Sequence, residues 1–539
     1  MKEMKLDYKK TIYVGLAFLL ISMFWQTYDN IIGKILIDKF GLNQTWSGLV
    51  MAVDNILALA LLPLFGMLSD KTRTKIGKRT PYIIIGTLIA ALAFVSLSFV
   101  DNSQTNKINT ETTIITDYEE VNAKIVAGDM LVDDWDNIFD DIKAERDDSL
   151  SKGVITENDY KRYETNISGA YDNIIEEGKY TEEIGRFDQR EIADIYYNYL
   201  STRAWELTRN DTKNLYLFIG ILLIVLVAMS TFRSPAVALM PDVTVKPSRS
   251  KANAVINLLG AVGGITSILL ISLLGLSKAS YVSYTPIFVA TSILMVVALI
   301  IFLFKVNEPK LIEQYNSDVL DYGLDEEDIA GEDYVERKLG KKELLSLVLI
   351  LLSVFFWFSG YNAVTTKLSD YAPKMLNMDF ATPLLVAQAT AIIAFIPIGI
   401  LSSKIGRKKM ILAGIILLTI CFGSAYFLDA ETGQILYLVL ALTGVAWATI
   451  NVNSFPMVVE LASGSNVGKY TGYYYTFSMA AQIMTPILSG LLMDNLGRGI
   501  LFPYATVFVA ISFVTMFFVK HGDSKPVAKK GLEAFDVED

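Results

Sequence analysis

The stretch GMLSDKTRTKIGKR, residues 66–79, lies between two long apolar segments and decides the topology of the chain. It holds five basic residues and one acid, Asp70. Short loops dense in Lys and Arg stay in the cytoplasm when a protein inserts into a membrane. A similar pattern, GILSSKIGRKK, returns at residues 399–409. The chain therefore contains an internal repeat with a basic cytoplasmic loop in each copy.

The composition is that of a polytopic membrane protein. Of 539 residues, 52% are hydrophobic and 19% are charged, and the mean hydropathy is +0.40, which is more apolar than a soluble domain. The single cysteine, Cys421, excludes an intrachain disulfide or a cysteine metal cluster, and the single histidine, His521, follows the last apolar run. We expect no enzyme, no metal site, no cofactor other than a coupling ion, and no nucleic-acid partner.

A bilayer core of about 30 Å needs about 20 apolar residues in a helix, and twelve runs of the chain qualify. They are residues 11–34, 45–68, 80–100, 214–240, 252–276, 284–305, 342–366, 381–402, 409–428, 433–458, 467–492 and 500–520. An even number places both termini on one side. We expect a multi-pass protein of the plasma membrane with both termini in the cytoplasm, its lipid-facing surface against the bilayer.

The repeat divides these runs into two halves, because residues 24–30 in the first run align with residues 356–362 in the seventh. Parallel six-helix repeats hold a solute near the bilayer midplane between them. The predicted fold is an all-α membrane protein of twelve transmembrane helices in two six-helix halves, plus a small α-helical extracytoplasmic domain. The predicted segments are 1–100 (helices 1–3), 101–213 (insert), 214–306 (helices 4–6), 307–341 (cytoplasmic linker), 342–520 (C-terminal bundle) and 521–539 (cytoplasmic tail).

The insert of residues 101–213 is acidic, with 27 acids against 13 bases, and the topology places it outside. Its apolar residues recur at helical spacing in three stripes. The stripes are Leu131, Trp135, Ile138, Phe139 and Ile142; Tyr160, Tyr163, Ile167, Tyr171 and Ile174; and Ile184, Phe187, Ile192, Ile195 and Tyr199. Thr156 with Asp159 is typical of a helix N-terminal capping pair. We expect a solvated acidic helical bundle whose partner is unknown.

Charged side chains inside membrane helices are costly and usually mark function. Asp29 and Asp54 are the two acids within the first two runs, and they are the candidates for binding a coupling cation or proton, H⁺ or Na⁺. Asp29 could instead be interfacial. Arg233 is the arginine well inside the fourth run; it could clamp an anionic solute, balance an acid, bond sugar hydroxyls, or snorkel to the cytoplasmic end.

Aromatic and amide side chains gather on helices 1, 7 and 10. Sugars are bound by stacking on aromatic rings and by hydrogen bonds to amides and carboxylates, although interfacial aromatic belts use the same residue types. The candidate solute-binding residues are Arg233, Trp25, Tyr28, Tyr361, Asn362, Trp447 and Asn451.

The predicted cytoplasmic loops carry charges of both signs at helix ends. Pairs that form in one state and part in another would make a cytoplasmic gate for alternating access; alternatively, these charges determine topology only. The candidate gate residues are Asp70, Arg73, Arg79, Asp242, Arg249 and Glu460.

Three stretches carry a family resemblance: residues 63–82, with Ser69-Asp70 and Gly77-Lys78-Arg79; residues 235–242; and residues 249–254. They resemble the major facilitator superfamily, and within it the sucrose-type and the glycoside-pentoside-hexuronide:cation symporters. The insert lies outside the resemblance. The resemblance implies cation-coupled transport of a sugar. Where melibiose-type relatives carry a sugar-binding acid this chain has Arg233, which would suit a sugar acid or another anion.

The leading hypothesis is a secondary active transporter that moves a sugar, glycoside or sugar acid by symport with H⁺ or Na⁺. One alternative is an exporter or flippase of amphipathic or lipid-like solutes. Another is an extracellular ligand-binding or sensing module, formed by the insert, on a transporter-like base.

Overall fold

The computed structural model describes residues 6–111, 114–127, 130–245, 249–277, 280–321, 339–461 and 467–522. Across these ranges the regular elements are helices, and twelve of them are long and apolar enough to cross a membrane. The predicted all-α class with twelve membrane helices is thereby confirmed. Residues 322–338 of the predicted linker lie outside the described residues.

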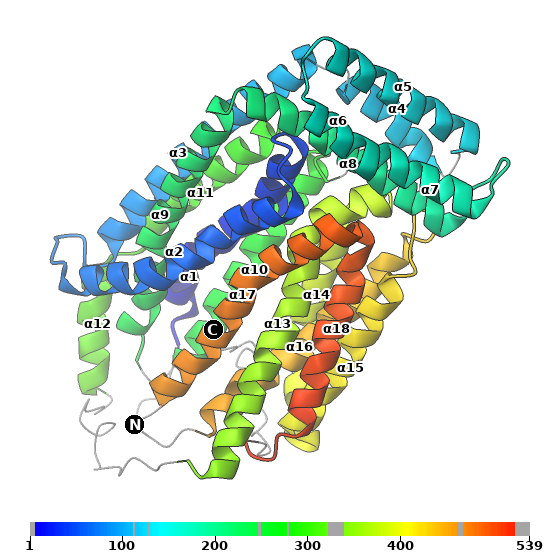
Figure 1. Ribbon diagram of the computed structural model, residues 1–539. Helices are drawn as coiled ribbons and strands as arrows, with labels where there is room; N and C mark the ends of the chain where they lie inside the picture. Colours follow the sequence, from blue (N-terminus) through cyan, green and yellow to red (C-terminus); the bar gives the residue numbers. More distant parts are fainter. Residues whose placement is uncertain are drawn as a thin grey trace.

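The membrane helices form two bundles of six (Figure 1). The N-terminal half holds α1 (Tyr8–Asp38), α2 (Gln44–Lys71), α3 (Thr80–Glu111), α9 (Lys213–Asp242), α10 (Arg249–Leu273) and α11 (Thr285–Lys305). The C-terminal half holds α13 (Lys341–Met375), α14 (Ala381–Ile405), α15 (Arg407–Ala425), α16 (Ile435–Val459), α17 (Val467–Leu496) and α18 (Leu501–Phe517). Helix α1 packs on α10 and α3 on α9 in the first half, and α14 packs on α16 and α13 on α18 in the second.

The two halves touch through α2 against α17 and α10 against α14. The α2–α17 contact is backbone to backbone: a Cβ added to Gly48 would lie 2.0 Å from the Pro486 carbonyl oxygen, and one added to Gly490 would lie 2.3 Å from that of Gln44. Both contacts lie at the end of the bundle that carries the insert. We call it the insert end, and the end where α1 begins and α18 finishes the terminal end. The halves converge at the insert end and diverge toward the terminal end (Figure 1).

Helices α1 and α13 extend further than apolarity predicted. Helix α1 continues past residue 34 to Asp38, and α13 continues past residue 366 to Met375. The α1 extension carries the buried Asp38, and the α13 extension carries the buried Lys367, Asp370 and Lys374. A count of apolar residues stops at such charges, whereas the helices continue because the charges find partners across the bundle.

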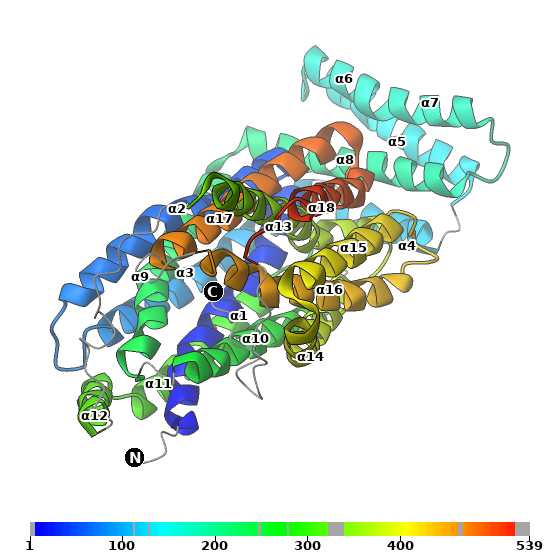
Figure 2. The same cartoon turned by 90° about the horizontal axis from the view of Figure 1, so that it is seen from below.

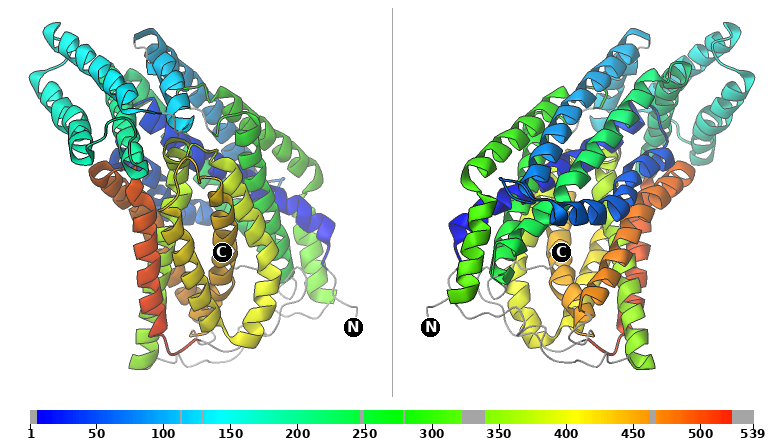
Figure 3. Two further views of the ribbon diagram at one scale, coloured as in Figure 1. Left: turned by 90° about the vertical axis from the view of Figure 1, so that its right-hand side faces the viewer. Right: turned by 90° about the vertical axis from the view of Figure 1, so that its left-hand side faces the viewer.

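The insert comprises α4 (Ile114–Ala127), α5 (Val132–Ser151), α6 (Glu157–Tyr163), a π-helical turn, η1 (Glu164–Ser168), α7 (Gly169–Gly178) and α8 (Arg186–Asn210). The three predicted stripes fall on α5, on the run from α6 to α7, and on α8, whereas α4 was not predicted. Thr156 and Asp159 form the expected capping box at the start of α6. The insert has its own aromatic core around Trp135, and Figures 2 and 3 show α5, α6 and α7 projecting beyond the membrane helices.

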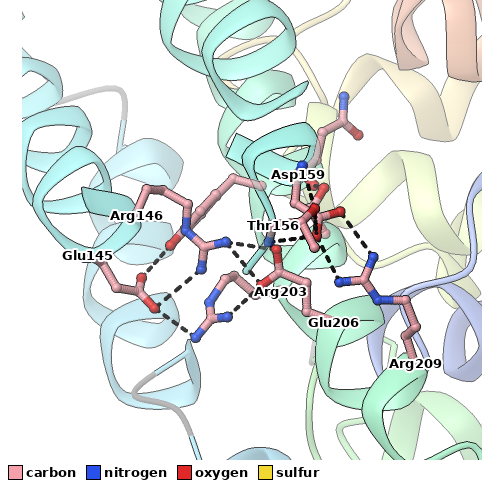
Figure 4. A network of polar contacts seen from close by, with 10 residues as sticks. Glu145, Arg146, Thr156, Asp159, Arg203, Glu206 and Arg209 are labelled. Carbon is pink, nitrogen blue, oxygen red and sulfur yellow. Dashed lines mark hydrogen bonds and ion pairs between the residues drawn. The ribbon is translucent and has the colours of Figure 1, made fainter. Parts of the chain in front are cut away.

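A polar network holds α5, α6 and α8 together (Figure 4). Arg146, buried on α5, donates to Glu206 of α8 at 2.8 Å, and Arg203 reaches the same carboxylate at 2.6 Å. Arg209 pairs with Asp159 at 3.0 Å. The hydrogen bonds from the Arg209 guanidinium hold the pKa of Asp159 well below its usual range. These ion pairs thus hold α5, α6 and α8 of the insert together.

Helix α12 (Glu308–Asp321) follows α11 at the terminal end. Its first residue, Glu308, accepts hydrogen bonds from the backbone N–H groups of Lys78, Arg79 and Thr80. These groups begin α3, and a carboxylate is favourable at a helix N-terminus. The basic loop at residues 66–79 is therefore anchored at its end by an acid from the start of the linker.

Candidate functional site

The predicted acids of the N-terminal half lie near Arg233. Asp29 of α1 interacts electrostatically with Asp54 of α2 and with Arg233 of α9, and Arg233 also interacts with Asp54. The Arg233 guanidinium carbon is 5.6 Å from the ring centroid of Trp25. Asp54 accepts a hydrogen bond from the Asn55 side chain at 2.8 Å. Three helices thus bring two carboxylates and one guanidinium together, with a formal charge of minus one when both acids are ionised.

Asp29 lies nine residues before the end of α1. At 1.5 Å per residue this places it about 13 Å from the insert end of its helix. Asp54 lies ten residues inside α2, at a similar depth. Both side chains are half-buried, as is Arg233. The extension of α1 therefore places Asp29 deeper within its helix than the apolar run alone predicted.

The predicted aromatic residues form one cluster in each half. Tyr361 of α13 stacks on Trp447 of α16, with ring centroids 3.7 Å apart and planes at 7°. In the other half, Trp25 and Tyr28 of α1 pack edge to face at 5.4 Å, and the buried Tyr28 hydroxyl donates to the Met51 carbonyl. Each half thus has an aromatic cluster that includes a residue of its first helix, Trp25 of α1 or Tyr361 of α13.

Two polar atoms in these clusters lack an internal partner. Nε1 of Trp25 and Nδ2 of Asn362 are both buried and have no hydrogen bond within the described part of the chain. A buried donor without a partner is costly, and in native structures it usually faces a water or a ligand. Asn451 is half-buried on α16, one turn beyond Trp447. A polar solute that accepted hydrogen bonds from these donors would remove the cost of leaving them unpaired.

The predicted gate charges pair within each half. Arg79 pairs with Asp70 and, at 2.9 Å, with Asp242, and all three belong to the N-terminal half. In the other half, Arg407 pairs with Glu460 at 2.5 Å. Arg73 is exposed. Arg249 begins α10, but its side chain lies outside the described residues. An ionic gate between the halves at this end stays a prediction.

At the insert end, by contrast, an ion pair and a hydrogen bond join the two halves. Lys374 of α13 bonds Asp38 of α1 at 2.6 Å and Asp370 at 2.5 Å. Arg498, just before α18, bonds Asp370 at 2.8 Å. Gln44 of α2 donates to Asp370 at 2.6 Å. We call Asp38, Gln44, Asp370, Lys374 and Arg498 the insert-end network.

Sequence reasoning missed this network, although one signal was present. Lys34 and Lys367 lie within one residue of equivalent positions in the repeat, and each has an aspartate three or four residues further on. Such spacing places both charges on one helix face. All four side chains are buried. Paired charges on corresponding helices therefore indicate a buried polar contact between halves rather than a solvated loop.

A groove of about 1640 Å³ lies beneath the insert. Its walls come from α2, including Trp46 and Val53, from insert residues such as Arg162 and Asn198, and from the end of α17, including Leu496. A smaller space of about 20 Å³ lies between the halves beside Lys34, Lys367 and Asp370.

These features define a multi-pass membrane transporter of two similar bundles. The sequence model of the major facilitator superfamily matches residues 203–396 and 380–537, and that of the MFS/sugar transport proteins matches residues 13–108. The chain therefore belongs to the major facilitator superfamily and is a secondary transporter rather than an enzyme. It is 32% identical, over 125 residues, to an uncharacterised MFS-type transporter of Methanocaldococcus jannaschii, a match that spans 23% of this chain and 30% of that protein.

Solved structures with the same fold cover nearly the whole chain. The xylose transporter XylE of E. coli in an inward-open conformation is 12% identical with a TM-score of 0.55, covering 98% of both chains. A bacterial homologue of the iron transporter ferroportin, in an inward-facing state, is 11% identical with a TM-score of 0.58, covering 95% of this chain and 99% of that one. A mutant of the nucleoside transporter NupG is 13% identical with a TM-score of 0.52, covering 95% and 98%. These likenesses concern the fold.

Proposed function

We propose that this protein is a cation-coupled symporter of a sugar, glycoside or sugar acid. The observation that carries the proposal is the grouping of Asp29 and Asp54 with Arg233 on α1, α2 and α9. Two acids balanced by one base carry a surplus negative charge. One H⁺ or Na⁺ neutralises that surplus, which is the requirement for a coupling site inside a membrane.

The solute would bind between this cluster and the aromatic pair of the other half. Trp25 and Tyr361 each offer a ring face or edge, and the partnerless donors Trp25 Nε1 and Asn362 Nδ2 suit hydroxyl or carboxylate oxygens. In this arrangement the Arg233 guanidinium balances the charge of the two acids and also packs against the Trp25 ring. Binding of the cation would reduce the negative charge beside Arg233. The interaction of Arg233 with the solute would then change, and this would couple the ion to the solute.

The proposed orientation in the membrane follows from the topology. The basic loop at residues 66–79 favours a cytoplasmic terminal end, and the insert would then lie outside the cell. With the insert end joined and the terminal ends apart, the structure would correspond to a state open to the cytoplasm. The fold likeness to inward-open XylE supports this assignment.

The test is uptake into proteoliposomes. A thermal-shift screen against sucrose, xylose and glucuronate first selects the probe, and uptake of that radiolabelled probe is then measured with an imposed H⁺ or Na⁺ gradient. We expect one gradient to accelerate uptake, Asp54→Asn to abolish that acceleration, and Asp54→Glu, which keeps the carboxylate, to retain part of it. Uptake that ignores both gradients would rule out the coupling.

A further inference from the structure

Helix α8 of the insert lies across the seam between the two halves. Its C-terminal part packs tightly on the N-terminal half: a Cβ added to Gly41, in the loop between α1 and α2, would lie 2.1 Å from the backbone nitrogen of Trp205. Gln104 of α3 donates to the Thr208 hydroxyl at 3.1 Å, and Lys107 donates to the Leu207 carbonyl at 2.8 Å. Helix α8 also leads directly into α9. This part of α8 therefore moves with the N-terminal half.

The N-terminal part of α8 contacts the other half. Asp194 accepts two hydrogen bonds from Arg498, one from Nη1 at 2.5 Å and one from the backbone nitrogen at 2.9 Å. Asn198 accepts from the same guanidinium at 2.9 Å. Arg190 donates to the Tyr426 carbonyl at 3.1 Å. We call Arg190, Asp194 and Asn198 the insert latch.

The latch joins the insert to the contact between the halves, because Arg498 also bonds Asp370 of the insert-end network. Asp194 and Arg498 are both buried, at 6% and 3% exposure. Removing one member of a buried ion pair leaves the other charge without compensation and is strongly unfavourable. The state in which the insert end is joined thus depends on a residue that lies outside the membrane helices.

We infer that Asp194 is a positioning residue for the insert-end network, and that the insert latch holds this end of the transporter closed. When the insert end opens, α8 remains on the N-terminal half and the latch parts from Arg498, Tyr426 and the rest of the C-terminal half. This role goes beyond the proposed symport because it involves neither the coupling ion nor the solute.

The test uses a thiol at the joined seam. Ser47 of α2 is 1% exposed, although the terminal ends of the halves lie apart, so a cysteine there becomes reactive only when the insert end opens. Ser47→Cys is placed in a Cys421→Ser background, and the rate of maleimide labelling is measured in purified protein. We expect Asp194→Asn to raise that rate about tenfold, the factor expected for one lost charge-assisted hydrogen bond. Asp194→Glu should restore most of the slow labelling, and Asp140→Asn, which alters an exposed acid of the same insert, should change nothing.

Native Cys421, buried in α15, separates gating from general loosening. In protein that keeps Ser47, its labelling rate should be unaffected by Asp194→Asn. Equal acceleration at both thiols, or no acceleration at position 47, would overturn the latch. If Asp194→Asn does not fold, Arg190→Gln carries the same test with the same outcomes, since it removes the bond to Tyr426. The readout needs no solute, so failure of the symport proposal would leave this result unaffected.

Discussion

The two ends of this transporter carry similar charges but pair them differently. At the insert end, Lys374 joins α13 to Asp38 of α1, with both side chains buried. At the terminal end, Arg79 pairs with Asp70 and Asp242 of its own half, and the Asp70 side chain is 58% exposed. Charges that bond across the seam join the halves, whereas charges that bond within a half leave them free to separate. The pairing of charges therefore decides which end is closed.

The largest effect should come from breaking the buried ion pair at the insert end. Lys374→Met removes the ammonium group that compensates the charge of Asp38 and part of that of Asp370. We expect this change to destabilise the joined insert end by about 3–5 kcal/mol. The thermal unfolding midpoint of purified protein should fall accordingly. The matched change at the other end, Asp70→Asn, should cost about 1 kcal/mol or less, because that pair is half in solvent. Equal losses in the two variants would contradict the distinction between the ends.

A smaller effect should follow from altering backbone contact without altering charge. Gly490→Ala places a methyl group 2.3 Å from the Gln44 carbonyl oxygen, so α17 must move away from α2. We expect a loss of about 1–3 kcal/mol, typical of overpacking, and faster labelling of Ser47→Cys in the Cys421→Ser background. Gly472→Ala in the same helix meets nothing within 4 Å and should stabilise by up to about 1 kcal/mol. Equal stability of the two alanine variants would show that α2 and α17 do not approach each other this closely.

The smallest effect concerns the insert alone. Asp159 has a lowered pKa because Arg209 donates hydrogen bonds to it. Its stabilising effect should be complete above the ordinary aspartate pKa of about 4 and decline as the pH falls toward the lowered folded value. Because the pair is partly solvated, Asp159→Asn should cost about 1 kcal/mol or less at pH 7 and less still at pH 3. Thermal unfolding of both proteins at the two pH values measures this cost. A cost of Asp159→Asn that was larger at pH 3 than at pH 7 would contradict the prediction.

Features set by local sequence were predictable, whereas those set by contacts between distant residues were not. The twelve apolar runs and the Thr156–Asp159 capping box depend on residues close in the chain, and the structure contains both. The helix ends at Asp38 and Met375 were missed because they depend on bonds such as that between Lys374 and Asp38, which lie 336 residues apart.

The candidate site divides in the same way. The acids Asp29 and Asp54 stand out in the sequence because charges are rare in apolar runs, and the repeat pointed to Trp25 and Tyr361. The sequence left balancing an acid as one of several roles for Arg233, and the choice among them and its contact with Trp25 depend on how α9 packs against α1 and α2. Asp194 was missed because it lies within the third apolar stripe of the insert and its partner is in another domain.

Paired distances across both ends test the central claim, that the joined end and the separated end exchange, most directly. Spin labels on cysteines at Trp46 and Leu496 report the insert end, and labels at Met67 and Tyr473 report the terminal end; all four residues are exposed and lie on α2 and α17. In the Cys421→Ser background, we predict that Lys374→Met lengthens the first distance and shortens the second. A change at one end only, or changes in the same direction at both, would contradict the account.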